Sequence, residues 1–185
     1  VRELFKLGIR SLPIIILAGL FVGMVLSFQA YVNMRTFGAE ASVGTLTALA
    51  LFRELGPVLT GLLYTGGVSS ALTAEILTPR FFAGVLAVPI LGVLYSAIGI
   101  MGGYLVATFA LGVDGGAYWS QMQSAVDLNT DIVQGILVKT LVFGVITNLV
   151  ALREGFIGRP TADGIARSTT STVVKASLIV LVADF

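Results

Sequence analysis

The sequence predicts an all-α integral membrane protein, in which an N-terminal interfacial helix is followed by five transmembrane helices. Hydrophobic residues make up 56% of the 185 residues and charged residues only 11%, whereas a soluble domain has about 25% charged residues. The mean hydropathy is +0.98. Apolar runs of about 20 residues, the length that a helix needs to cross a bilayer, recur between short polar segments. These observations indicate one multi-pass membrane domain over residues 1–185.

Composition also excludes several functions. The 11 basic and 10 acidic residues leave a net charge of +1, so we expect no nucleic-acid partner. The chain has no Cys and no His, which removes thiolate metal sites and every catalytic site that needs an imidazole base. The nearest approach to a P-loop is Lys139-Thr140, which no glycine turn precedes. We therefore expect no enzymatic site, and no metal or cofactor bound by this chain.

The N-terminal segment, residues 1–12, mixes basic and apolar side chains. This pattern suits a helix that lies in the membrane interface, and it suits equally a charged flank that stops the first span. The first span follows at about residues 13–32 as an almost uninterrupted apolar run. Within it, Gly19 and Gly23 form a small-xxx-small pair, which allows another helix to approach closely.

The later spans follow the same pattern of apolar runs. They are predicted at about residues 44–67, 81–111, 132–152 and 173–185, the last of them cut short at Phe185. The longest polar connection before the end of the chain is 112–130. It should contain a Gly115-Gly116 turn, with Tyr118 and Trp119 as aromatic residues at the membrane interface.

The polar segments also predict the orientation in the membrane. Lys and Arg gather in the N-terminal flank and in the connections 69–80 and 153–172, whereas the connections 33–42 and 112–130 contain only Arg35. Cytoplasmic segments carry the excess of Lys and Arg. We therefore expect a cytoplasmic N-terminus, with the 112–130 connection on the outside.

Two adjacent charges and a proline interrupt the second span. Arg53 and Glu54 are consecutive, so on a helix they point about 100° apart and need separate partners. Pro57 lacks an N–H group and crowds the carbonyl group of Arg53, so we expect a kink there and a free backbone acceptor. Charges at this place either fasten the helices together or contact a substrate directly.

The depth of these charges limits their partners. A rise of about 1.5 Å per residue places Arg53 and Glu54 roughly 10 to 15 Å below the outer surface. Gln29, near the end of the first span, and Lys139, near the start of the fourth, fall in the same outer half. Our hypothesis is that Lys139 neutralises Glu54, either across helices or across a dimer seam.

Segments along the whole chain resemble the MlaE family of permeases. They are FVGMVLSFQAY at 21–31, LFRELGPVLTGLLYTG at 51–66, SALTAEI at 70–76, TPRFFAGVLAVPIL at 78–91 and ADGIARSTTSTVV at 162–174. The RELGP motif in this setting is the most specific of them. MlaE is the membrane subunit of the Mla phospholipid transporter, an ABC-type system of Gram-negative envelopes.

The resemblance implies an ABC-exporter-like permease dimer in the bacterial inner membrane. Each chain would couple to a cytoplasmic MlaF-like ATPase with an MlaB-like STAS partner, beneath a periplasmic hexameric ring of MlaD-like MCE proteins. ATP and Mg would be used by the ATPase. The implied function is to move glycerophospholipids between the inner membrane and the MCE ring, which maintains the lipid asymmetry of the outer membrane. A scaffold that tethers the MCE ring and an ATP-independent secondary transporter or channel are the alternatives.

The chain departs from the family pattern between Ile76 and Leu77. The family has a longer cytoplasmic stretch here, which includes the helix that docks into the ATPase. Either the protein lacks this coupling helix, or the sequence omits a cytoplasmic loop at this point. We favour the omitted loop, with Glu75 and Arg80 as flanks of the ATPase contact.

The resemblance also suggests how a lipid would be held. Arg53 is the best candidate to meet the phosphate, because a guanidinium binds phosphate oxygens through two parallel hydrogen bonds. Apolar stripes could line a lipid cavity, or they could serve ordinary packing, which is the commoner use. The stripes are Phe21, Met24, Val25 and Phe28 on the first span, and Leu55, Val58, Leu59 and Leu62 on the second.

Overall fold

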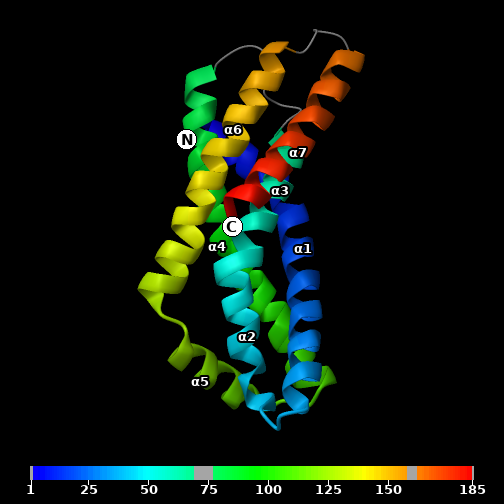
Figure 1. Cartoon of the computed structure of the whole chain (residues 1–185), viewed down its shortest axis with the longest axis vertical. Helices are drawn as coiled ribbons and strands as arrows, with labels where there is room; N and C mark the ends of the chain where they lie inside the picture. The colour runs from blue at the N-terminus through cyan, green and yellow to red at the C-terminus, as the bar shows by residue number, and fades with distance from the viewer. Residues whose placement is uncertain (1, 69–76, 158–161, 185) are drawn as a thin grey trace.

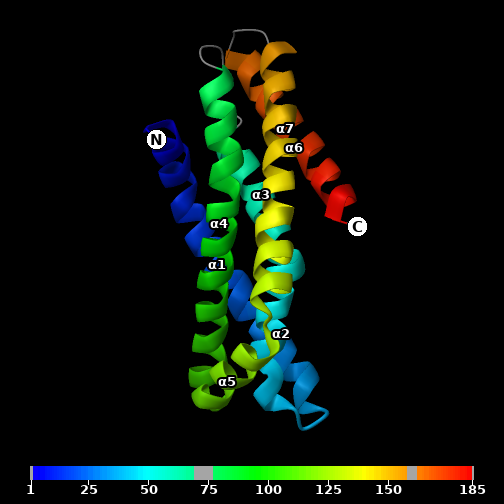
Figure 2. The ribbon, with the colours of Figure 1, turned by 90° about the vertical axis from the view of Figure 1, so that its left-hand side faces the viewer.

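The computed structural model describes residues 2–68, 77–157 and 162–184. Within these ranges the chain forms helices joined by short turns, without a strand. Most of the helices run along one long axis, so the molecule is an elongated bundle (Figure 1, Figure 2). The described helical stretches that are long and apolar enough to cross a membrane are Leu12–Arg35, Glu40–Thr65, Phe82–Ala110 and Leu128–Glu154.

The first helix, α1, runs without a break from Arg2 to Arg35. The predicted interfacial helix at 1–12 and the predicted first span at 13–32 are therefore parts of one helix. Pro13 lies inside α1, and a proline there removes one backbone hydrogen bond. The apolar run that follows favours helix in spite of this loss, because a helix is the way in which a membrane segment satisfies its own backbone groups.

Helix α1 packs closely along α4, Leu77–Leu105, which continues into the π-helical turn η3, Val106–Ala110. Glycines permit this approach. A methyl group at Gly23 would overlap the backbone of Gly99, and one at Gly19 would press on the carbonyl oxygen of Tyr95. The small-xxx-small pair of the first span is thus a close helix contact.

The second span is a continuous series of helical segments. They are the 3-10 turn η1 (Glu40–Ser42), α2 (Val43–Ala50), the π-helical segment η2 (Leu51–Leu55) and α3 (Gly56–Val68). In a π-helix each amide reaches back five residues rather than four, as the amide of Gly56 does to the carbonyl oxygen of Leu51. The distortion expected around Pro57 is therefore a widened helical turn directly before it.

The outer connection predicted at 112–130 contains a helix, α5 (Gly115–Ala125), in place of the predicted glycine turn. Asp114 caps α5, since its carboxylate accepts a hydrogen bond of 2.7 Å from the amide of Ala117. Tyr118 is fully buried rather than interfacial, and its Oη donates to the carbonyl oxygen of Ile100 at 3.2 Å. Burial raises the pKa of Tyr118 to about 12.

The rest of the chain forms η4 (Leu128–Val138), α6 (Lys139–Ile157) and α7 (Ala162–Asp184). The segment η4 is π-helical. It begins at Leu128, so the helix starts earlier than the fourth span predicted at 132–152. Most of the polar connection predicted at 153–172 is helical too, because its Ala and Arg residues favour helix despite their polar neighbours. The apolar part of α7, Thr170–Ala183, is shorter than a full span.

Two buried clusters hold the described helices together. The larger one includes Tyr64, Tyr95 and Tyr118 and joins α1 to α5. The smaller one, made of Val58, Phe143 and Val180, joins α3, α6 and α7. Many large apolar side chains remain exposed on the outside of the bundle. Such a surface would be unusual in a soluble monomer, and it suits contact with lipid.

Candidate functional site

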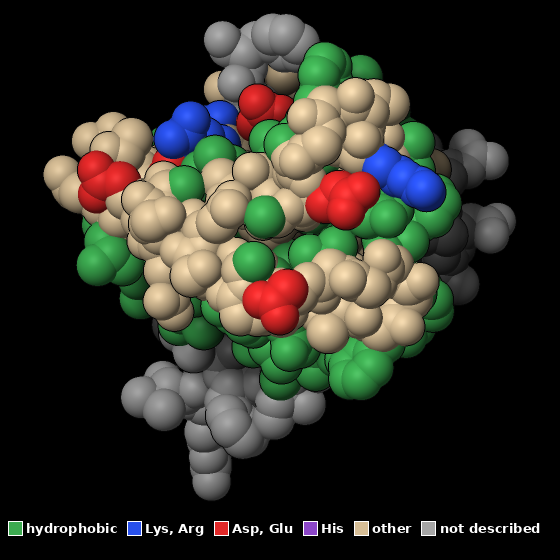
Figure 3. Space-filling model, turned by 90° about the horizontal axis from the view of Figure 1, so that it is seen from below, with side chains coloured by type: hydrophobic (Ala, Val, Ile, Leu, Met, Phe, Trp, Pro, Cys, Tyr) green, Lys and Arg blue, Asp and Glu red, His purple; other side chains and the backbone are tan. Residues whose placement is uncertain are grey.

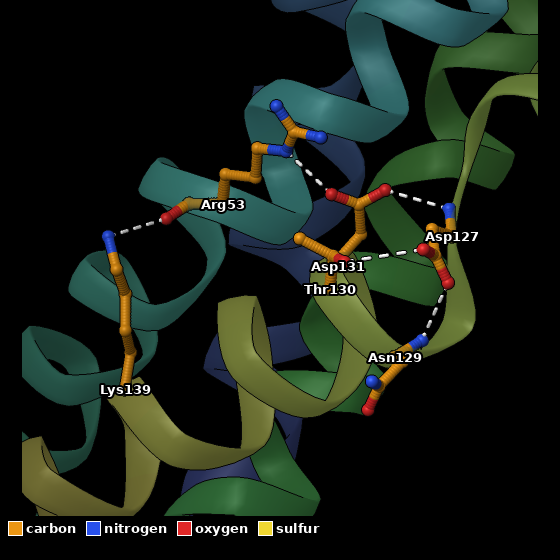
Figure 4. Close-up of polar contacts among 6 residues, drawn as sticks. All are labelled: Arg53, Asp127, Asn129, Thr130, Asp131 and Lys139. Carbon is orange, nitrogen blue, oxygen red and sulfur yellow. Dashed lines mark hydrogen bonds and ion pairs between the residues drawn. The ribbon is translucent and has the colours of Figure 1, made fainter.

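The two π-helical segments η2 and η4 meet at an ion pair between Arg53 and Asp131. Nε of Arg53 lies 2.6 Å from Oδ1 of Asp131 (Figure 4). The side chain of Asp131 is 0% exposed, whereas that of Arg53 is 53% exposed. A side chain at Gly135 would press on the carbonyl oxygen of Phe52, so this glycine lets the two segments approach.

Asp131 is held in place from its own segment as well. Its Oδ2 accepts a hydrogen bond of 2.8 Å from the amide of Asp127, and its amide donates to the carbonyl oxygen of Asp127 at 2.8 Å. Asp127 in turn caps η4, because its carboxylate accepts from the amide of Asn129 at 3.0 Å and from the hydroxyl of Thr130 at 3.3 Å. The partner of Arg53 is therefore fixed before any ligand arrives.

Lys139 contacts the backbone of the same residue. Its Nζ donates a hydrogen bond of 2.8 Å to the carbonyl oxygen of Arg53 (Figure 4). This oxygen is the acceptor that the sequence predicts to be free, because Pro57 has no N–H group. Arg53 is thus attached to the fourth span at two points, through its guanidinium and through its carbonyl group.

Glu54 points to a different environment, as expected for a neighbour on a helix. Its side chain is exposed, and no ion pair joins it to another residue in the described part of the chain. Within a single chain, Lys139 therefore contacts Arg53 rather than Glu54. A pair between Lys139 and Glu54 across a dimer seam stays a prediction.

The apolar stripe of α1 faces outward. Phe21 is 56% exposed, Val25 55% and Phe28 52%, while Met24 is partly buried and Gln29 is exposed. The first three side chains therefore do not serve packing within the chain. They are available to lipid or to another chain.

The stripe of the second span is turned inward. Leu59 packs against the larger buried cluster and Leu62 against the smaller one. Leu55 is partly buried, and Pro57 is buried. Ordinary packing accounts for these leucines within a single chain. Of the predicted flanks of the ATPase contact, Glu75 lies outside the described residues, as does the side chain of Arg80.

Asp131 is the site residue that the sequence does not single out. It lies one residue before the fourth span predicted at 132–152, where it counts as part of a polar connection. Two signals point to it in retrospect. Arg53 needs a carboxylate that is not Glu54, and Asp131 lies two helical turns before Lys139, which shares the depth of Arg53.

Comparison with known proteins identifies the family. The family model for permease MlaE matches residues 1–78 and 76–185. The intermembrane phospholipid transport system permease protein MlaE of Haemophilus influenzae is 46% identical over 208 aligned residues, which cover all of this chain and 79% of that protein. A probable ABC transporter permease protein of Rickettsia typhi is 34% identical, and the aligned region covers 79% of that protein. The chloroplastic protein TRIGALACTOSYLDIACYLGLYCEROL 1 of Arabidopsis thaliana is 28% identical and covered to 59%. The chain therefore belongs to the MlaE permease family.

Proposed function

We propose that the chain is the permease subunit of an ABC-type transporter that moves glycerophospholipids between the inner membrane and a periplasmic MCE ring. This transport would maintain the lipid asymmetry of the outer membrane. The name of the Haemophilus relative supports the phospholipid substrate, and that of the Rickettsia relative supports the ABC class. The observation that carries the proposal is a half-exposed guanidinium, Arg53, held near the middle of an apolar span.

The bonding of Arg53 suits phosphate recognition. Among the described residues, its guanidinium bonds only to Asp131, through Nε. Figure 4 shows no hydrogen bond from the two terminal nitrogens to any of the residues drawn. Asp131 therefore orients the guanidinium and leaves the terminal donors for a phosphate group. The exposed apolar side chains of α1 would contribute to the wall around the acyl chains.

A second copy of the chain would complete this site. Arg53 and Glu54 are exposed within a membrane span, and charged side chains in such a place are costly when they face lipid. Two copies that pair over these residues would enclose them in a shared cavity. In that cavity, Lys139 of one copy could approach Glu54 of the other.

ATP chemistry is assigned to other chains. The sequence has no P-loop motif, so we propose an MlaF-like ATPase with an MlaB-like partner in the cytoplasm. The family match is divided at residues 76–78, and the alignment with the Haemophilus protein has 208 positions for a chain of 185 residues. Both facts support an omitted cytoplasmic loop between Ile76 and Leu77, which would hold the coupling helix between Glu75 and Arg80.

The opposite end of the bundle would face the MlaD-like hexamer in the periplasm. Figure 3 looks onto this end and shows acidic side chains, with a few basic ones among them, scattered over a polar surface, and apolar side chains around its edge. Glu40, Asp114 and Asp127 are exposed in this part of the chain. Most Lys and Arg residues of the sequence fall instead in the N-terminal flank and in the segments 69–80 and 153–172, which supports a cytoplasmic N-terminus.

Reconstitution tests the proposal. The full-length permease is placed in liposomes with its ATPase, STAS and MCE partners, and the movement of labelled phospholipid is measured with and without ATP. ATP-dependent movement that Arg53→Ala abolishes, in a complex that still assembles, is the expected result. Movement without ATP would favour a secondary transporter, and no movement at all would favour a scaffold. Loss of the assembled complex in Arg53→Ala would instead support a fastening role for Arg53.

A further inference from the structure

A second candidate site lies between α6 and α7, toward the end of α6 away from Asp131. A cavity of about 210 Å³ opens there, far larger than one water molecule requires. Its surface is apolar, because the charged residues that line it contribute their aliphatic stems. The lining residues are Val150, Arg153, Glu154, Lys175, Leu178 and Ile179.

Charged groups stand beside this apolar cavity. Nζ of Lys175 donates a hydrogen bond of 2.8 Å to Oε1 of Glu154, whose side chain is 8% exposed. Half of the Lys175 side chain remains exposed, and Arg153 is exposed as well. Because Lys175 neutralises Glu154, the positive charge of Arg153 is left in excess. The mouth of the cavity is therefore cationic.

The position of the cavity matches the boundary between hydrocarbon and headgroups. The apolar stretch Leu128–Glu154 ends at this place, so Arg153 lies where a span leaves the hydrocarbon. On the neighbouring helix, Leu178 is 59% exposed and Ile179 44%. The two helices lie side by side in both views (Figure 1, Figure 2). A molecule in the cavity would reach both the hydrocarbon and the headgroup layer.

We propose that this groove between α6 and α7 binds one anionic phospholipid of the surrounding bilayer. One acyl chain enters the cavity, and the phosphate lies on Arg153 and Lys175. Basic pockets between membrane helices are typical sites for anionic headgroups. A free phosphate ion does not match the groove, because the cavity itself offers hydrocarbon surface. The bound lipid braces α7 against α6, and the site is independent of Arg53 and of the proposed transport.

Native mass spectrometry of the full-length permease complex tests this site. The complex is stripped of lipid in detergent and then titrated with phosphatidylglycerol, which carries one net negative charge, or with zwitterionic phosphatidylcholine. Arg153→Gln should weaken phosphatidylglycerol binding by about tenfold, the loss expected for one charge-assisted contact, and should affect phosphatidylcholine much less. Arg35→Gln is the matched control, since it removes the same charge from the opposite end of the bundle.

Two further variants keep the test decisive. Leu178→Trp, which fills the cavity, should weaken the binding of both lipids. Arg53→Ala should keep the preference for phosphatidylglycerol, so failure of this site can be told apart from failure of the proposed transport. Equal losses of phosphatidylglycerol binding in Arg153→Gln and Arg35→Gln would overturn the proposal. Binding of inorganic phosphate alone at this site, as tight as that of phosphatidylglycerol, would overturn it too. A change in the number of permease copies in Leu178→Trp, with lipid binding intact, would make the groove an interface between copies.

Discussion

The side chain of Lys139 donates a hydrogen bond of 2.8 Å to the carbonyl oxygen of Arg53. In an α-helix this oxygen would accept a hydrogen bond from the amide four residues later in the chain, but the residue there is Pro57, which has no N–H group. The fourth span therefore supplies a donor that the second span lacks. Since Asp131 holds the guanidinium from the same span, Arg53 can stand half-exposed in an apolar environment and remain oriented.

Pro57 and Lys139 should be energetically coupled. Pro57→Ala restores a backbone donor for the carbonyl oxygen of Arg53, so the hydrogen bond from Lys139 becomes less important. Lys139→Met should then cost about 1 kcal/mol less in the Pro57→Ala background than in the wild type, which is the net value of one hydrogen bond. Free energies of unfolding for the four proteins of this cycle, measured in detergent, check the coupling. Equal costs in both backgrounds would show that Lys139 acts through another contact.

Removing Arg53 and removing Asp131 from the ion pair should cost the protein different amounts of stability. Arg53→Ala leaves a carboxylate that is 0% exposed without its cation, whereas Asp131→Asn leaves a guanidinium that is 53% exposed and keeps an acceptor for the amide of Asp127. We expect Arg53→Ala to cost about 1–3 kcal/mol, the penalty of a broken buried pair reduced for the exposure of Arg53. Asp131→Asn should cost less, and the double variant should be more stable than Arg53→Ala. Thermal unfolding in detergent checks this order, and the reverse order would refute the burial argument.

The contact between α1 and α4 should be sensitive to a single methyl group. Gly23→Ala would place a methyl group on the backbone of Gly99, and such overpacking costs about 1–3 kcal/mol. Gly61→Ala is the control, because its methyl group would meet Phe143 at 3.5 Å, which is ordinary contact. It should be neutral or stabilising by up to about 1 kcal/mol, the helix-propensity gain of Ala over Gly. The melting temperatures of the two variants test this expectation. A similar fall in melting temperature in both would contradict the close contact between α1 and α4.

Tyr118 should make stability fall at high pH. Burial raises its pKa from 10.0 to about 12, so between these values the unfolded chain loses a proton that the folded chain keeps. The stabilisation is complete below pH 10 and is lost as the pH rises toward 12. Tyr118→Phe should remove this part of the pH dependence. The difference in melting temperature between wild type and variant, followed from pH 8 upward, should narrow as the pH rises. A constant difference would mean that Tyr118 does not titrate differently on folding.

The parts of the fold that depend on local composition are predictable from the sequence. The first four apolar runs fall on described helical stretches that are long and apolar enough to cross a membrane, because each span must satisfy its own backbone in lipid. Helix α7, however, begins at Ala162, well before the apolar run predicted at 173–185. The glycine turn predicted at 115–116 is wrong, since Asp114 caps a helix there. Tyr118 is buried rather than interfacial because it fits between α2 and α4. Such a tertiary contact leaves no local signal in the sequence.

The candidate site is predictable only in part. The need of Arg53 and Glu54 for separate partners and the free carbonyl group beside Pro57 follow from helix geometry alone. The identity of the partners does not follow, because Asp131 is 78 residues from Arg53 along the chain and Lys139 is 86 residues away. Their approach depends on two π-helical segments and on Gly135, which together set the relative rotation of the second and fourth spans.

The most direct test compares lipid transport in Arg53→Ala with that in the double variant Arg53→Ala/Asp131→Asn, using the reconstituted complex with ATP. The double variant carries no unpaired buried carboxylate, so its stability should recover. If Arg53 meets the phosphate of the lipid, both variants should lose ATP-dependent phospholipid movement, although the double variant assembles and melts nearly as the wild type does. Recovery of transport in the double variant to the wild-type rate would contradict this role and would leave Arg53 as a fastening residue.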